Sequence, residues 1–138
     1  MHLAGRIEKD GRFWMIEVPI LDVATQGRTR KEAYCMIKDA IESLANEQGF
    51  SVEVVPGTGK YFQVTSNDPS KLMAFLLKRQ RQKQGLSLAD MAERLGQKSR
   101  NAYARYEQGK ADPTVKQLLM LLSVVNPRAD IVITERLK

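Results

Sequence analysis

The sequence is poor in the residues that build disulfides and metal sites. Its 138 residues contain 1 cysteine, 1 histidine and 1 tryptophan. The single cysteine, Cys35, cannot form an intrachain disulfide, and its apolar neighbours predict a buried structural thiol. The only histidine, His2, lies at the terminus, and no cluster of metal-ligand residues is present. We therefore expect no metal and no cofactor.

Long hydrophobic runs are also missing. No apolar stretch approaches the ~20 residues needed to cross a bilayer, and residues 1–10 contain no apolar stretch of signal-peptide length. Hydrophobic residues at 43% and charged residues at 28% are typical of a folded soluble protein. We expect a cytoplasmic protein with no membrane partner.

Negative charge is scarce in the second half of the chain. Residues 69–138 hold 14 Lys and Arg against 6 Asp and Glu, a net charge of +8, whereas residues 1–68 hold 8 against 10, a net charge of −2. The two halves are therefore suited to different partners, and the basic half is suited to a polyanion. Charge alone leaves a solvated basic face as an equal alternative.

The first half predicts a sheet with one helix packed on it. Alternating residues from Leu3 to Ile7, an Asp10-Gly11 turn signal and a return strand over 13–18 predict a hairpin, which Pro19 ends. A short extended piece over 23–26 precedes a helix that Thr29 and Glu32 cap. Residues 51–55 and 61–65 are rich in strand formers, so the predicted order is β-β-(β)-α-β-β. The helix has one apolar stripe, made of Ala33, Ile37, Ala40, Ile41 and Leu44.

From Asp68 onward the pattern becomes helical. Asp68 can cap a helix that has Pro69 at its first position, and three more helices are expected from Ser87, from Ser99 to Glu107, and from Thr114 to a stop before Pro127. Residues 131–133 predict a short strand, for which a second subunit could supply the partner strand. The predicted class is α+β, with one domain over 1–67 and a second over 68–138. The predicted inward faces are Leu72, Phe75, Leu76, Ala89, Ala92, Leu95, Tyr103, Tyr106, Val115, Leu118, Leu119, Leu121 and Leu122.

The segment from Gly85 to Gly109 carries a motif. It has a small residue, Ala92, where two helices would cross, a Leu-Gly turn ending at Gly96, and a Glu-Gln-Gly stop after the third helix. It resembles the phage-repressor-like (Cro/repressor) helix-turn-helix family. Two departures are that the turn after Gly96 is one residue longer than usual, and that Leu88 stands where the family often has a phosphate-binding Gln.

Arginine and asparagine define the outward face of the third helix. Arg binds guanine and Asn binds adenine through paired hydrogen bonds, and a helix N-terminus favours a phosphate. A helix-turn-helix kept only for dimerisation is the alternative, which the Arg and Asn face argues against. The weaker phosphate candidates are Arg79 and Lys83. The predicted DNA-binding residues are Lys98, Ser99, Arg100, Asn101, Arg105 and Lys110.

Residues 14–33 carry a second resemblance. Pro19, the Thr-Gln-Gly of 25–27 and the Thr-x-x-Glu-Ala of 29–33 resemble the HicB antitoxin family, and the likeness covers roughly residues 3–55. The resemblance implies a partial ribonuclease-H-like fold that binds and neutralises a HicA-type mRNA-cleaving toxin. It also implies repression of the shared operon, by binding of double-stranded operator DNA through the C-terminal domain. A dimer or tetramer is expected, because one helix-turn-helix covers one half-site and paired recognition helices lie about 34 Å apart.

Two further functions are alternatives to an antitoxin. The first is a stand-alone regulator whose N-terminal half senses a small molecule or only dimerises. The second is a nuclease, which needs carboxylates converging on divalent metals. Glu17, Asp22, Asp39 and Glu42 are available, but Asp39 and Glu42 fall beside or opposite the apolar stripe, so we expect no enzyme activity. Trp14 is either a core residue or part of a partner interface.

Overall fold

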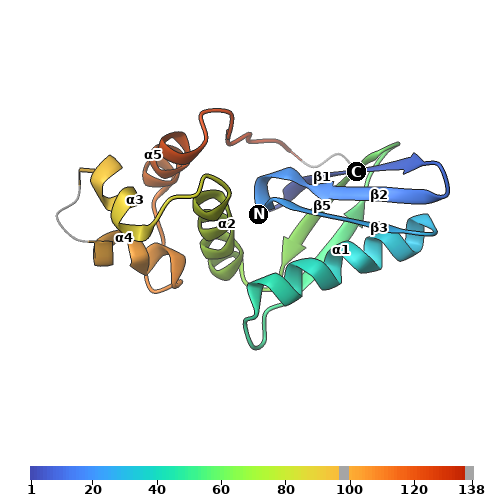
Figure 1. The fold of residues 1–138 in the computed structure, drawn as a ribbon, viewed down its shortest axis with the longest axis horizontal. Helices are drawn as coiled ribbons and strands as arrows, with labels where there is room; N and C mark the ends of the chain where they lie inside the picture. Colours follow the sequence, from blue (N-terminus) through green and yellow to red (C-terminus); the bar gives the residue numbers. More distant parts are fainter. Residues whose placement is uncertain (97–99, 136–138) are drawn as a thin grey trace.

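The computed structural model describes residues 1–96 and 100–135 as an antiparallel sheet beside a group of short helices (Figure 1). The helix α1 covers one face of the sheet, and the helical half lies at one end of it. The elements, in chain order, are β1 (Leu3–Asp10), β2 (Phe13–Val18), η1 (Pro19–Leu21), β3 (Val23–Gly27), α1 (Arg30–Ala45), β4 (Val52–Pro56), β5 (Tyr61–Ser66), α2 (Pro69–Lys83), α3 (Leu88–Arg94), α4 (Arg100–Glu107) and α5 (Val115–Val125).

The sheet has the strand order β3-β2-β1-β5-β4, and every neighbouring pair is antiparallel. The predicted alternation along β1 is confirmed, since Leu3, Gly5 and Ile7 are buried whereas Ala4 and Arg6 between them are exposed. Phe62 packs directly over Gly5, where a Cβ would lie 2.1 Å from its ring. The opposite face of the sheet leaves Met15 and Tyr61 exposed.

The helix α2 joins the two halves. It begins where predicted, since the Asp68 carboxylate accepts hydrogen bonds from the amides of Ser70 and Lys71 at 3.1 and 3.2 Å. It packs against η1 and β5 on one side and against α4 and α5 on the other (Figure 1). Six of its residues are therefore buried, which is more than a single apolar stripe along the helix would bury. The hydrophobic core runs without a break from the sheet to α5.

A buried amide fixes this junction. Gln80 is fully buried, and among the polar and charged residues that the structure describes it is the one with its backbone and side chain both out of contact with solvent. Its Nε2 donates to the Ile20 carbonyl at 2.6 Å, and its Oε1 accepts from Asn126 Nδ2 at 3.1 Å. Because buried hydrogen bonds are directional and costly to break, Gln80 sets how η1, α2 and the end of α5 lie against one another.

The caps of the later helices follow the sequence. Ser87 and Asp90 exchange hydrogen bonds in a capping box at the start of α3, and Thr114 and Gln117 do the same at α5. These boxes set the starts of α3 and α5 through side chains and amides three residues apart.

Several predicted core positions are wrong. Cys35 is exposed, because it lies on the face of α1 that points away from the sheet; its apolar neighbours were a poor guide to its own position on the helix. Leu44 lies in the last turn of α1 and is also exposed. Ala89 is exposed and Met91 is buried in its place. Val115 and Leu119 are exposed on α5, since periodicity defines a stripe but not how far a packing partner extends along it.

The predicted strand over 131–133 does not form. Residues 131–135 have no strand conformation, and Ile133 is 92% exposed. A strand needs a neighbour for its backbone hydrogen bonds, and within residues 1–96 and 100–135 no other strand pairs with this segment. The segment therefore lacks a strand because of its tertiary surroundings and not because of the local preference of its residues.

Candidate DNA-binding surface

The helix α4 presents one face to solvent and one to the core. Tyr103 and Ala104 are buried beneath it. Arg100, Asn101 and Arg105 are exposed, as predicted. These three side chains can donate to base edges and phosphates, and the Arg and Asn face expected from the sequence is exposed on a single helix.

A buried ion pair holds this helix in place. Arg81 of α2 donates through Nε and Nη2 to both carboxylate oxygens of Glu107, at 2.7 and 2.9 Å. The two side chains are only 14% and 6% exposed. The hydrogen bonds that Arg81 donates to the Glu107 carboxylate raise the pKa of Arg81. Arg81 also donates to the Leu86 carbonyl at 2.9 Å, so one guanidinium ties α2 to the end of α4 and to the turn before α3.

Below the recognition helix the packing is apolar. Tyr103 is fully buried and burial raises the pKa of its phenol. Met91 of α3 is fully buried as well, and α3 packs against α4. Gly96 ends α3 with a φ of 68°, the left-handed conformation that the motif predicts. The two helices of the motif are therefore a packed pair and not separate segments.

Lys110 follows the recognition helix directly. Gly109 adopts a φ of 70°, and the Lys110 amide donates to the Arg105 carbonyl at 3.0 Å, which closes the helix with a glycine cap. Lys110 is exposed. The cap thus places a cation beside the same end of α4 that carries Arg105.

The other predicted DNA-binding residues have different outcomes. Lys98 and Ser99 lie outside the described residues. Lys83 is exposed in the last turn of α2. Arg79 instead donates to the carbonyls of Leu21 and Asp22 at 2.9 and 2.7 Å, so its guanidinium joins the two halves and the geometry does not support a phosphate contact.

One exposed position on α4 was missed. Ala102 lies on the exposed side of the helix, between Asn101 and Arg105. An Ala methyl can contact the methyl group of thymine. The signal was available in the spacing of the buried Tyr103 and Ala104, but sequence reasoning looked only for polar side chains.

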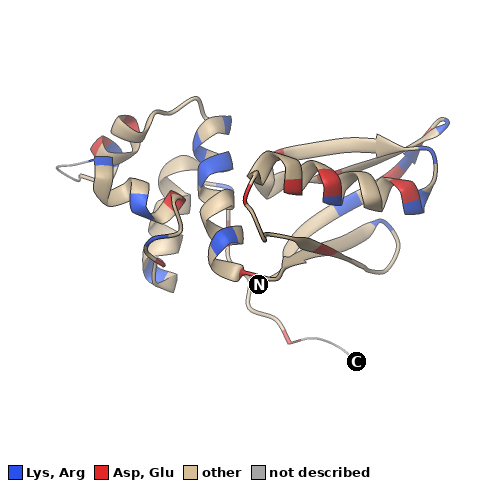
Figure 2. Cartoon of the chain, turned by 90° about the horizontal axis from the view of Figure 1, so that it is seen from below, with Lys and Arg blue, Asp and Glu red and all other residues tan. Residues whose placement is uncertain are grey.

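Charge complements this face. Figure 2 shows Lys and Arg spread over the helical half, with few acids among them. The segment 69–138 carries the net charge of +8 already noted. A surface of this charge is suited to attract a phosphate backbone irrespective of base sequence.

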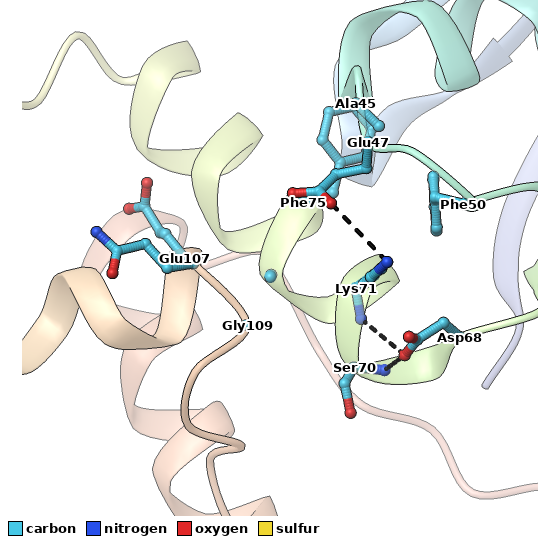
Figure 3. Close-up of a pocket in the computed structure, with 11 residues that line it drawn as sticks. Ala45, Glu47, Phe50, Asp68, Ser70, Lys71, Phe75, Glu107 and Gly109 are labelled. Carbon is cyan, nitrogen blue, oxygen red and sulfur yellow. Dashed lines mark hydrogen bonds and ion pairs between the residues drawn. The ribbon is translucent and has the colours of Figure 1, made fainter.

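A small cleft lies beside this surface, between the end of α1, the start of α2 and the end of α4 (Figure 3). Its volume of about 150 Å³ is small for a ligand pocket. Its polar groups are also occupied: Asp68 caps α2, Lys71 lies 3.9 Å from Glu47, and Glu107 holds Arg81. The cleft therefore does not favour a sensor of small molecules.

Within residues 1–96 and 100–135, no group of three or more His, Cys, Asp or Glu could hold a metal ion. No helix there is long and apolar enough to cross a membrane. The carboxylate of Glu42 accepts from Lys38 and from the Val52 amide at 2.9 Å, so it ties α1 to β4.

Comparison with known proteins adds a family assignment for the helical half. A family model described as helix-turn-helix matches residues 77–126. No curated protein matches the chain. The matched range holds the end of α2, all of α3, α4 and α5, and every recognition residue discussed above. Residues 77–126 are therefore similar to a helix-turn-helix of the Cro/C1 type, and this similarity suggests a DNA-binding transcriptional regulator.

Proposed function

We propose that this protein is the antitoxin of a type II toxin–antitoxin pair and represses its own operon. In this proposal α4 reads double-stranded operator DNA, while residues 1–67 bind and neutralise a HicA-type toxin. The observation that carries the DNA-binding part is the exposed set of Arg100, Asn101 and Arg105 on a helix fixed by the buried Arg81–Glu107 pair. The toxin-binding part rests on the HicB-like pattern over residues 14–33, including the ribonuclease-H-like fold that it implies.

The exposed face of α1 is the surface that best suits such a toxin. Met36 is exposed there beside the carboxylates of Glu32 and Asp39, which follow one another along the helix. An apolar side chain ringed by acids complements a basic protein, and a toxin that cleaves RNA would be basic. This surface is on the opposite side of α1 from the residues that pack on the sheet.

Growth assays test the proposal with the full chain. Cells expressing the small reading frame next to this gene should arrest, and the intact protein should restore growth. Asp39→Arg places a positive charge on the α1 surface that is proposed to bind the basic toxin, so this variant should fail to rescue. The variant Arg100→Ala should rescue fully while it binds the operator more weakly. No arrest from a soluble, well-expressed neighbour would overturn the antitoxin assignment.

We propose that a second copy completes the DNA site. Apolar side chains are exposed on α5 at Val115, Leu119 and Met120, and the extended segment after it exposes Val132 and Ile133. Pairing of these segments across a two-fold axis would cover them and would supply the missing strand partner. Sedimentation should show a dimer or tetramer that Ile133→Asp dissociates, and a monomeric wild-type chain at micromolar concentration would refute the pairing.

The proposed activity is binding and not catalysis. Among the acids considered for a nuclease, Glu42 is engaged between α1 and β4, and Asp22 lies 3.9 Å from Arg79 at the junction of the halves. Labelled RNA incubated with the protein and Mg²⁺ or Mn²⁺ should stay intact. Metal-dependent cleavage that follows the protein through purification would contradict this part of the proposal.

A further inference from the structure

Three turns meet at the end of the sheet that is farthest from the helix-turn-helix. The strand registers pair Asp10 with Phe13, Trp14 with Gly27, and Pro56 with Phe62. The β1–β2 turn, the β3–α1 junction and the β4–β5 turn therefore lie together. The junction with α2 is at the other end of the strands (Figure 1).

Positive charge gathers at this end although residues 1–68 are acidic as a whole. Six of the eight Lys and Arg of that segment lie in these turns or next to them, with Glu8, Asp10 and Glu32 as the acids among or beside them. Figure 2 shows basic residues at this tip of the molecule. We name this group the distal basic end; it consists of Lys9, Arg12, Arg28, Arg30, Lys31 and Lys60.

One member of the group, Arg30, links the segments that carry the others. The Arg30 guanidinium lies 5.4 Å from the ring centre of Trp14, and its Nε donates to Tyr34 Oη at 3.2 Å. It also donates to the Gly59 carbonyl. Arg30 thus links β2, α1 and the β4–β5 turn, and holds the three basic segments side by side.

The remaining cations are mostly uncompensated. Lys60 lies 3.5 Å from Glu8. By contrast Lys9, Arg12, Arg28 and Lys31 are exposed, and within the described residues their side chains form no hydrogen bond or ion pair. Like charges held close together repel one another and favour a bound polyanion. A folded frame that keeps four such cations at one end is suited to phosphates.

Exposed aromatic rings directly follow two cations of this group in the chain, since Arg12 precedes Phe13 and Lys60 precedes Tyr61. Phe13 and Tyr61 are the first residues of β2 and β5, the two strands that flank β1, and both point to the face that α1 does not cover. They are 39% and 64% exposed. Rings on an open sheet face stack with unpaired bases, whereas a duplex presents only its phosphates to such a surface.

We propose that the distal basic end, with Phe13 and Tyr61, is a second nucleic-acid site that binds single-stranded RNA or DNA. The cations hold phosphates, and the two rings stack bases. This site is separate from the duplex-binding helix α4, and the inference does not rest on the antitoxin assignment. One chain would then hold a duplex at one end and a single strand at the other.

Fluorescence anisotropy with the full chain tests this. The probes are labelled 12-nucleotide oligo-U, oligo-dT and a 20-base-pair duplex. The variant Arg12→Ala/Arg28→Ala/Lys31→Ala should bind the single strands at least tenfold more weakly and lower the slope of log K against log salt by about 2, since each phosphate contributes about 0.7. Tyr61→Ala should weaken single-strand binding roughly fivefold or more. Duplex binding should be unchanged in both variants.

The matched control removes three cations elsewhere. Lys78→Ala/Lys116→Ala/Arg128→Ala has the same net charge and should keep single-strand affinity. Equal losses in the two triple variants would overturn the site, as would single-strand affinity that follows Arg100→Ala instead. A preference for oligo-U or for oligo-dT decides between RNA and DNA. Displacement of the oligo-U by oligo-glutamate of equal charge at equal concentration would show charge attraction alone and would refute base stacking.

Discussion

The two halves of this molecule build their candidate binding surfaces in different ways. In the helical half the recognition side chains are neighbours in sequence on a single helix, α4, and one buried ion pair holds that helix. In the sheet half each surface is assembled from several segments, as where Arg30 links three elements at the distal basic end. The comparison teaches that a motif reveals the first kind of surface and only the fold reveals the second.

The largest expected effect comes from removing the ion pair that holds α4 in the helical half. Glu107→Ala leaves the Arg81 guanidinium buried without its partner, which should destabilise the protein by about 3–5 kcal/mol. Urea unfolding measures this. Glu93→Ala, an exposed acid on α3, is the control and should change stability by less than about 0.5 kcal/mol. Similar losses for the two variants would contradict a structural role for the buried pair.

The next prediction tests whether the halves form one cooperative unit. Gln80→Met keeps the volume of the side chain but leaves the Ile20 carbonyl and the Asn126 amide without partners, at a cost of about 1–3 kcal/mol. Tryptophan fluorescence reports on the sheet through Trp14, and circular dichroism reports mostly on the helices. We expect the two transitions to coincide in the wild-type chain and to separate in the variant, whereas Gln82→Met should leave them together.

A smaller effect concerns recognition alone. Arg100→Ala should weaken operator binding by about 1–3 kcal/mol and blunt discrimination at one base pair. Anisotropy with the operator and with random duplex measures the difference. If both duplexes lost the same affinity, Arg100 would be a phosphate contact and the base-reading assignment would be wrong.

The smallest effect is the acid sensitivity of the sheet half. The pKa of Glu42 lies below its ordinary 4.5; burial acts to raise it, but hydrogen bonds from Lys38 and the Val52 amide lower it more. A lowered folded pKa adds stability that is present above 4.5 and is lost as the pH falls through the folded value. Glu42→Gln should therefore flatten the decline of stability below about pH 4.5, as measured by urea unfolding over a series of pH values.

Much of the local structure was predictable from sequence. Thr29, Asp68, Ser87 and Thr114 cap helices where expected, because capping depends on a side chain and an amide two or three residues away. The recognition helix and its exposed Arg100, Asn101 and Arg105 followed from the helical period and a known motif. Strand alternation in β1 was likewise confirmed.

Errors arose where burial depends on what packs nearby. Cys35 has apolar neighbours yet faces solvent, and Met91 is buried in place of Ala89. Residues 131–133 have strand preference but no partner strand in the chain. Arg79 is basic but is used between the halves, since its carbonyl partners are 58 and 57 residues away. None of these distances in space can be read from distances along the chain.

The sequence by itself therefore determined the helix starts, the strand alternation and the helix-turn-helix, because each depends on residues a few positions apart. Only the tertiary structure decided that α2 serves both halves, that Gln80 joins them, and that cations from three turns gather at one end of the sheet. Those features depend on how strands pair and helices pack, which brings residues together across long stretches of chain.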